Sequence, residues 1–180
     1  MIFITGGVRS GKSAFAERFV QRYGQDARYI YVATGVAFDR EMEARIKRHQ
    51  LDREQQGLHW LTVEMQVEIP AAMKQLNAQH VLLFECVTTW LANVLYHTET
   101  LDNREQRIAD YILAFQEQLL AWQQQGVRVV IVSNEILDEP RSPFDEVELY
   151  RKLIGQFHQW IVTHCESAYE VQYQLVQQWK

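Results

Sequence analysis

One segment limits the possible folds of this chain more than any other, the stretch GGVRSGKS at residues 6–13. It matches the pattern GxxxxGK[ST] without a gap, follows a short apolar run at residues 1–5 and precedes a helical pattern at residues 14–23. Between a strand and a helix, such a loop turns its backbone N–H groups toward phosphates, and its glycines allow a close approach. We therefore expect a site for a nucleoside triphosphate.

Each polar group of this loop has an expected task. Lys12 should reach the β- and γ-phosphates, Ser13 should bind Mg²⁺, and the start of the following helix adds a positive dipole end. A second acid is expected near the metal, with Glu85 after VLLF as the best-placed candidate and Glu135 after VVIVSN as the next, although each could be a surface acid. The residues expected to hold the nucleotide here are Gly6, Gly7, Val8, Arg9, Ser10, Gly11, Lys12 and Ser13.

Strands and helices alternate along the chain. The apolar runs at 80–86 and 127–133 are typical of parallel strands covered on both faces, and the apolar stripe of helix 104–125 is typical of a core or subunit contact. We predict an α/β fold, a single P-loop NTPase-like domain over residues 1–180 with a mostly parallel central sheet flanked by helices. The predicted strands are 1–5, 29–33, 60–63, 80–86, 127–133 and 168–176, and the predicted helices are 14–23, 39–49, 67–76, 104–125 and 147–164.

Composition excludes several classes of protein. Of the 180 residues, 47% are hydrophobic, which suits a globular chain, and the net charge of −5 argues against a nucleic-acid-binding surface. No membrane span or secretory signal is visible, so a cytoplasmic location is expected. Cys86 and Cys165 form no CxxC pair, and Cys86 in its apolar run is expected to be a small buried hydrophobe.

His49 ends the predicted helix 39–49, directly after the basic residues Arg45, Lys47 and Arg48. Taken alone, such a histidine is most often solvated or complements the helix dipole. Neighbouring cations, however, lower an imidazole pKa, favour its neutral nucleophilic form and attract phosphates. The other histidines show no metal-ligand spacing such as HExxH.

Six segments occur in a characteristic order, GGVRSGKS, YIYVATG, DREMEARIKRHQ, HWLTVE, VLLFECVTTWLANVL and VIVSNE. In this combination the chain resembles the adenosylcobinamide kinase/adenosylcobinamide-phosphate guanylyltransferase family of cobalamin biosynthesis. The similarity covers about the first three-quarters of the chain closely and continues weakly to its end. The P-loop alone is widespread, whereas the combination of the later segments is far more specific.

The resemblance implies a two-step enzyme. One activity phosphorylates adenosylcobinamide with ATP or GTP, and the other transfers GMP from GTP to adenosylcobinamide phosphate through a guanylyl-histidine. By this resemblance His49 is the nucleophile, Lys12 is the second catalytic residue, and Mg²⁺ is the cofactor, bound at Ser13 and Glu85. It also implies a homotrimer. The further nucleotide-contacting positions that it implies are Ala33, Thr34, Gly35, Arg53, Glu64 and Glu85.

The chain departs from the family pattern in its last quarter. Residues 136–143 contain no glycine where the family has a glycine-rich stretch, and His158-Gln159 replaces an Asn-Gln pair. The usual C-terminal Gly-Ile-Pro is also absent. Two alternatives therefore stay open, a divergent P-loop kinase acting on another small molecule and a nucleotide-binding protein that lacks one or both cobinamide activities.

Overall fold

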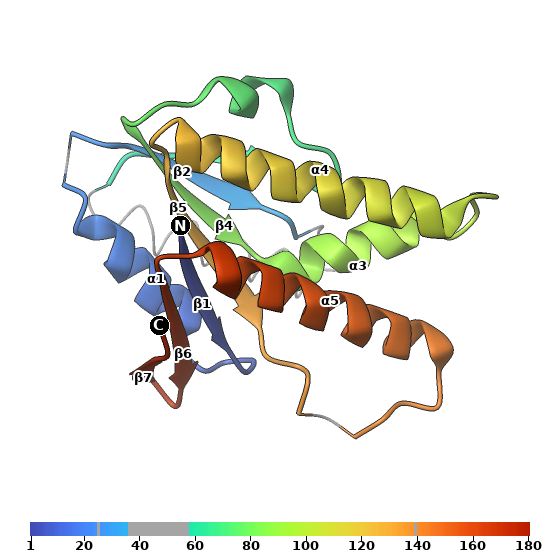
Figure 1. Ribbon diagram of the computed structural model, residues 1–180. Helices are drawn as coiled ribbons and strands as arrows, with labels where there is room; N and C mark the ends of the chain where they lie inside the picture. Colours follow the sequence, from blue (N-terminus) through green and yellow to red (C-terminus); the bar gives the residue numbers. More distant parts are fainter. Residues whose placement is uncertain (25, 36–57, 139) are drawn as a thin grey trace, which may run out of the picture.

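The computed structural model describes residues 1–24, 26–35, 58–138 and 140–180 (Figure 1). The predicted helix 39–49, with His49, and the predicted loop that contains Arg53 lie outside the described residues.

The described strands form one mostly parallel sheet, as the sequence predicts. Its strand order is β3-β2-β4-β5-β1-β6-β7, and all neighbours are parallel except the antiparallel pair β6–β7. The strands are β1 (Ile2–Gly6), β2 (Arg28–Ala33), β3 (Trp60–Glu64), β4 (His80–Glu85), β5 (Arg128–Asn134), β6 (Ser167–Gln172) and β7 (Leu175–Gln178).

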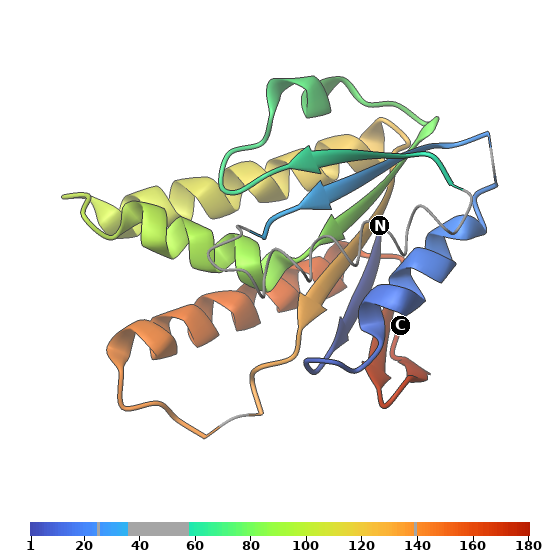
Figure 2. The same cartoon turned by 180° about the vertical axis from the view of Figure 1, so that it is seen from behind.

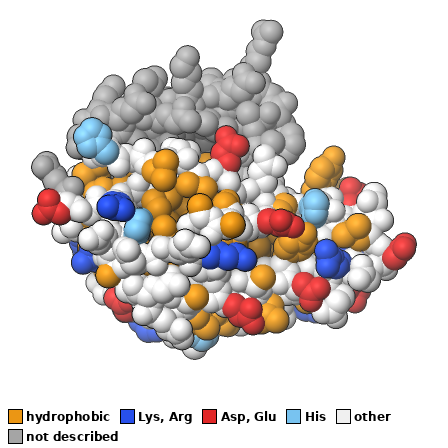
Figure 3. All heavy atoms as spheres, turned by 90° about the horizontal axis from the view of Figure 1, so that it is seen from above, with side chains coloured by type: hydrophobic (Ala, Val, Ile, Leu, Met, Phe, Trp, Pro, Cys, Tyr) orange, Lys and Arg blue, Asp and Glu red, His pale blue; other side chains and the backbone are white. Residues whose placement is uncertain are grey.

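Helices cover both faces of this sheet. One face carries α3 (Val87–Thr98), α4 (Arg104–Gln124) and α5 (Asp145–His164), and the other carries α1 (Lys12–Gln21), as Figures 1 and 2 show together. In the described part of the chain, no helix combines the length and the apolar character needed to cross a bilayer. Acidic and basic side chains are interspersed between hydrophobic ones on the upper surface (Figure 3).

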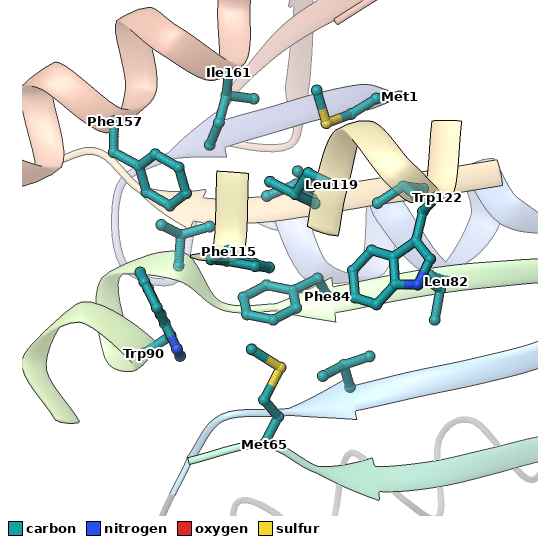
Figure 4. Close-up of a cluster of buried hydrophobic side chains, with 14 of the residues drawn as sticks. Met1, Met65, Leu82, Phe84, Trp90, Phe115, Leu119, Trp122, Phe157 and Ile161 are labelled. Atoms are coloured by element: carbon teal, nitrogen blue, oxygen red, sulfur yellow. The ribbon is translucent and has the colours of Figure 1, made fainter. Parts of the chain in front are cut away.

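Two apolar layers explain the continuous hydrophobic strands. Along β4, Leu82 and Phe84 enter the large core under α3, α4 and α5, whereas Val81 and Leu83 enter the smaller core under α1. Side chains alternate across a strand, so a strand covered on both sides is apolar at every position. In the large core the Phe115 ring of α4 lies between Phe84 and Trp90, with centroid distances of 4.8 Å and 4.7 Å (Figure 4).

Two sequence predictions need correction, and one helix was missed. The predicted helix 67–76 is only a short 3₁₀ helix, η1 (Ala71–Gln75), because Pro70 precedes it in an extended conformation with ψ of 137°. The predicted last strand is a hairpin, β6–β7, which reverses at Tyr173 and Gln174. Helix α3 was not predicted; only Cys86 separates its first residue from the end of β4.

Candidate functional site

The phosphate loop connects β1 directly to α1. Arg9 and Gly11 both adopt left-handed backbone angles, with φ of 61° and 94°, and the Ser10 N–H donates to the Gly7 carbonyl over 3.2 Å. A Cβ at Gly6 would lie 2.2 Å from the Val171 carbonyl oxygen, so only glycine fits there. This close approach brings the end of β1 against β6 and gives the loop its sharp turn.

Lys12 lies at the centre of this loop. It is 6% exposed, and its Nζ donates to the Gly7 carbonyl oxygen over 3.1 Å. Val8 and Arg9 form the exposed tip. The Lys12 ammonium thus lies across the concave side of the loop, where phosphate oxygens can take the place of a carbonyl acceptor.

Ser13 and Glu85 meet although 72 positions separate them in the chain. The Ser13 hydroxyl donates to Glu85 Oε1, and the Tyr31 hydroxyl donates to Glu85 Oε2 over 3.3 Å. This convergence follows from the topology, since parallel strands β1, β2 and β4 all end at the same edge of the sheet. A hydroxyl and a carboxylate side by side are oxygen ligands of the kind that Mg²⁺ prefers.

Glu135, the other candidate acid, is directed elsewhere. Its backbone N–H donates to the Gly6 carbonyl over 2.9 Å, and its Oε1 accepts from the Leu137 N–H over 2.5 Å. Its carboxylate therefore stabilises the loop that follows β5, whereas Glu85 is the acid in contact with Ser13. Within the described ranges, no group of three or more His, Cys, Asp or Glu side chains could hold a metal. A Mg²⁺ ion beside Ser13 would thus depend on one carboxylate and on nucleotide phosphates, which is a common arrangement for this ion.

Thr34 is completely buried and fixes the backbone beside Glu85. Its hydroxyl donates to the Glu85 carbonyl over 3.1 Å and accepts from the Cys86 N–H over 2.8 Å. The Thr34 carbonyl in turn accepts from the Asn93 side-chain amide over 2.8 Å. These bonds hold the end of β2 against the end of β4 and fix the backbone at Glu85.

The remaining predicted positions of this edge lie further from the loop. Ala33 is in register with Glu85 on one side and with Glu64 on the other. Glu64 is exposed on β3, the edge strand, and two strand spacings of about 4.8 Å separate it from Glu85. Gly35 follows with open space at its Cβ position. The structure therefore brings Ser13 and Glu85 together and leaves Glu64 about 10 Å from Glu85 across the sheet.

A polar cluster at the start of α3 was missed from the sequence. Cys86, predicted to be buried, is only partly buried, and its Sγ lies 3.1 Å from the Thr88 hydroxyl and 3.0 Å from the Thr89 hydroxyl. The Asn134 amide donates to the Thr88 hydroxyl over 2.9 Å, and the Tyr150 hydroxyl donates to the Thr88 carbonyl over 2.9 Å. Burial raises the pKa of Tyr150 to about 12. The signal available in the sequence was the hydroxyl pair in ECVTT, directly after the acid that ends β4.

The loop that departs from the family pattern is attached to α5. Arg151 donates to the Pro140 carbonyl over 2.7 Å and to the Leu137 carbonyl over 3.0 Å. In the same region His158 is buried, and its Nε2 lies 2.7 Å from the Ser133 hydroxyl. Burial lowers the pKa of His158 to about 4, so this histidine is neutral at neutral pH.

Comparison with known proteins identifies the family of this chain. Residues 2–175 match the family described as "CobU: Cobinamide kinase / cobinamide phosphate guanyltransferase". The chain is 34% identical over 142 residues to the bifunctional adenosylcobalamin biosynthesis protein CobU of Escherichia coli, covering 76% of this chain and 75% of the relative. It is 35% identical over 171 residues to the bifunctional adenosylcobalamin biosynthesis protein CobP of Pseudomonas aeruginosa, and this match covers 92% of this chain and 88% of the relative.

A solved structure supports the fold. The crystal structure of the RadB recombinase superposes with a TM-score of 0.51 at 16% identity, covering 94% of this chain and 72% of that chain. At this identity the similarity concerns the arrangement of strands and helices alone. Because the family match extends over nearly the whole chain, this protein belongs to the cobinamide kinase/cobinamide phosphate guanyltransferase family.

Proposed function

We propose that this chain catalyses both reactions of its family at one phosphate loop, phosphorylation of adenosylcobinamide and transfer of GMP to the product. The observation that carries the proposal is the contact between Ser13 and Glu85 beside the buried Lys12, in a chain that matches the family over residues 2–175. The family match and the curated relatives favour these activities over the two alternatives considered from the sequence.

In the kinase reaction, the hydroxyl of adenosylcobinamide attacks the γ-phosphorus of ATP or GTP, and the nucleoside diphosphate leaves. The backbone N–H groups of residues 6–13 orient the phosphates. The Lys12 ammonium neutralises charge on the β- and γ-phosphate oxygens as the bond breaks. The contact between Lys12 and the loop carbonyl supports this task, since it places the cation on the concave side of the loop.

In the guanylyl reaction, a neutral His49 attacks the α-phosphorus of GTP and pyrophosphate leaves. The phosphate of adenosylcobinamide phosphate then attacks the same phosphorus, the P–N bond breaks, and His49 is released. Covalent catalysis of this kind divides one difficult transfer into two easier displacements. The role of His49 is supported by the family resemblance and by the cations that precede it in the sequence.

Ser13 and Glu85 are the residues that would hold Mg²⁺. Their adjoining oxygens fit the ion, because it commonly binds through one or two protein oxygens together with substrate phosphates. When bound, the ion supplies positive charge that stabilises the departing diphosphate or pyrophosphate. Tyr31, which donates to the second Glu85 oxygen, orients this carboxylate.

We further propose, from the family resemblance, a homotrimer that works in the cytoplasm. Sedimentation analysis of the purified chain tests the assembly, because a monomer at working concentration would contradict the trimer. The homotrimer is independent of the chemistry proposed above.

Product analysis by mass spectrometry tests the function. With adenosylcobinamide, Mg²⁺ and GTP, the unmodified chain should form adenosylcobinamide phosphate and then adenosylcobinamide-GDP. Lys12→Ala should abolish both products, whereas His49→Ala should still form the phosphate and stop there. If His49→Ala makes adenosylcobinamide-GDP at the rate of the unmodified chain, the proposed nucleophile is wrong. If the unmodified chain forms neither product, the proposed function fails.

A further inference from the structure

The β6–β7 hairpin turn lies against the phosphate loop. The Gln174 N–H donates to the Ser10 carbonyl over 2.9 Å, and a Cβ at Gly11 would lie 3.2 Å from Gln174 Cγ. Figures 1 and 2 both show the tip of this hairpin beside the loop between β1 and α1. The turn therefore touches the phosphate loop at the residues just before Lys12.

Two features of this turn are unfavourable for stability, its strained backbone and its exposed aromatic ring. Tyr173 and Gln174 both adopt left-handed angles, with φ of 51° and 67°, in a two-residue turn that usually carries Asn-Gly. Tyr173 is also 91% exposed, although its neighbours Val171 and Ala168 on β6 are buried. Nearby, the Ser10 hydroxyl is buried and has no hydrogen-bond partner among the described residues. An uncovered ring and an unpartnered hydroxyl beside a phosphate loop both point to a ligand.

The order of the strands indicates which end of the nucleotide reaches this turn. Glu85 ends β4, which lies two strands from β1 on one side, and the hairpin begins with β6, which pairs with β1 on the other side. The γ-phosphate is directed toward the metal ligands Ser13 and Glu85. A nucleotide lying across the loop therefore extends its sugar and base away from Glu85, toward β6 and β7.

We infer that Tyr173 is the base-contacting residue of this site and that its ring stacks on the purine of the bound nucleotide. This inference rests on the proposed function of the phosphate loop and adds a base-binding element to it. Stacking uses the face of the base, which every base possesses, so Tyr173 should serve ATP and GTP alike. The Gln174 N–H bond to the Ser10 carbonyl keeps the turn, and with it Tyr173, at a fixed place beside the phosphates.

Calorimetric titration with GTP, ATP and inorganic tripolyphosphate, each with Mg²⁺, tests the inference. Tyr173→Ala should weaken GTP and ATP binding by at least about fivefold, the lower end of the effect of losing one base–aromatic stack. Tripolyphosphate has no base, so its affinity should not change. Tyr173→Phe keeps a ring and should bind GTP as the unmodified chain does. Tyr96→Ala removes another exposed tyrosine, on α3, and is the matched control.

The outcomes separate this inference from the function on which it rests. Unchanged GTP affinity in Tyr173→Ala would overturn the inference and leave the phosphate loop intact. An equal loss of GTP and tripolyphosphate affinity would also overturn it, because the substitution would then have disturbed the loop itself. If the unmodified chain binds neither GTP nor tripolyphosphate, both the proposed function and the inference fail.

Discussion

Acid should destabilise this protein through one buried histidine, His158 on α5. Its ring lies 5.1 Å from that of Phe3 and hydrogen-bonds with the Ser133 hydroxyl, and burial lowers its pKa from 6.5 to about 4. Below pH 6.5 the unfolded chain binds a proton that the folded chain refuses until about pH 4, so stability falls as the pH decreases through this interval. At about 1.4 kcal/mol for each pKa unit, the full loss is about 3 kcal/mol. Above this interval the histidine adds no pH dependence.

Urea unfolding measured by tryptophan fluorescence at a series of pH values tests this prediction. His158→Gln keeps a side-chain amide for Ser133 but cannot titrate. Between neutral pH and pH 4 the free energy of unfolding of this variant should therefore fall by about 3 kcal/mol less than that of the unmodified chain. Carboxylates titrate in both proteins and cancel in the difference. His59→Gln changes an exposed histidine and should follow the unmodified chain. Parallel curves for His158→Gln and the unmodified chain would refute the reasoning.

Three further predictions concern the site and the core. Glu85→Gln should lower both activities by about 100-fold or more in the turnover assay, because it removes the carboxylate that would hold the Mg²⁺ ion beside the phosphates, and Glu135→Gln should have a much smaller effect. Replacing Tyr173 and Gln174 by Asn and Gly should raise the free energy of unfolding by about 1–2 kcal/mol, because the left-handed turn loses its strain; an unchanged or lower melting temperature would contradict this. Phe115→Ala should cost about 3–5 kcal/mol in urea unfolding, because it empties the centre of the aromatic core.

The correctly predicted parts of the fold are those with a signal in a short stretch of sequence. The apolar strands β4 and β5 were recognised because a strand covered on both faces is hydrophobic throughout. The phosphate loop was recognised because its residues are contiguous and stand between a strand and a helix. Both signals lie within about ten residues, so tertiary contacts were not needed to interpret them.

The errors concern elements that lack a local sequence signal or whose conformation is set by tertiary contacts. Helix α3 begins after a single residue, Cys86, which makes no side-chain cap, so no capping residue in the sequence marks its start. The segment before η1 is held by a tertiary bond instead of a helix, since the Trp90 Nε1–H donates to the Val67 carbonyl over 2.9 Å. The hairpin reverses at Tyr-Gln, which lacks the Asn-Gly signature of such turns.

The candidate site was only partly predictable for the same reason. The sequence proposed both Glu85 and Glu135 as the second acid, and only the pairing of strands shows which carboxylate contacts Ser13. The partial exposure of Cys86 was missed because the hydroxyls that surround it come from the unpredicted helix α3. Cys86 lies beside Glu85 because it is the first residue after β4.

The central claim is that one phosphate loop serves both a phosphoryl transfer and a guanylyl transfer to His49. Intact-mass measurement after incubation with GTP and Mg²⁺, without any corrinoid, tests it most directly. We predict a single GMP adduct on the unmodified chain, no adduct on His49→Ala and none on Lys12→Ala. An unmodified chain that carries no GMP under these conditions, or an adduct that persists in His49→Ala, would contradict the account.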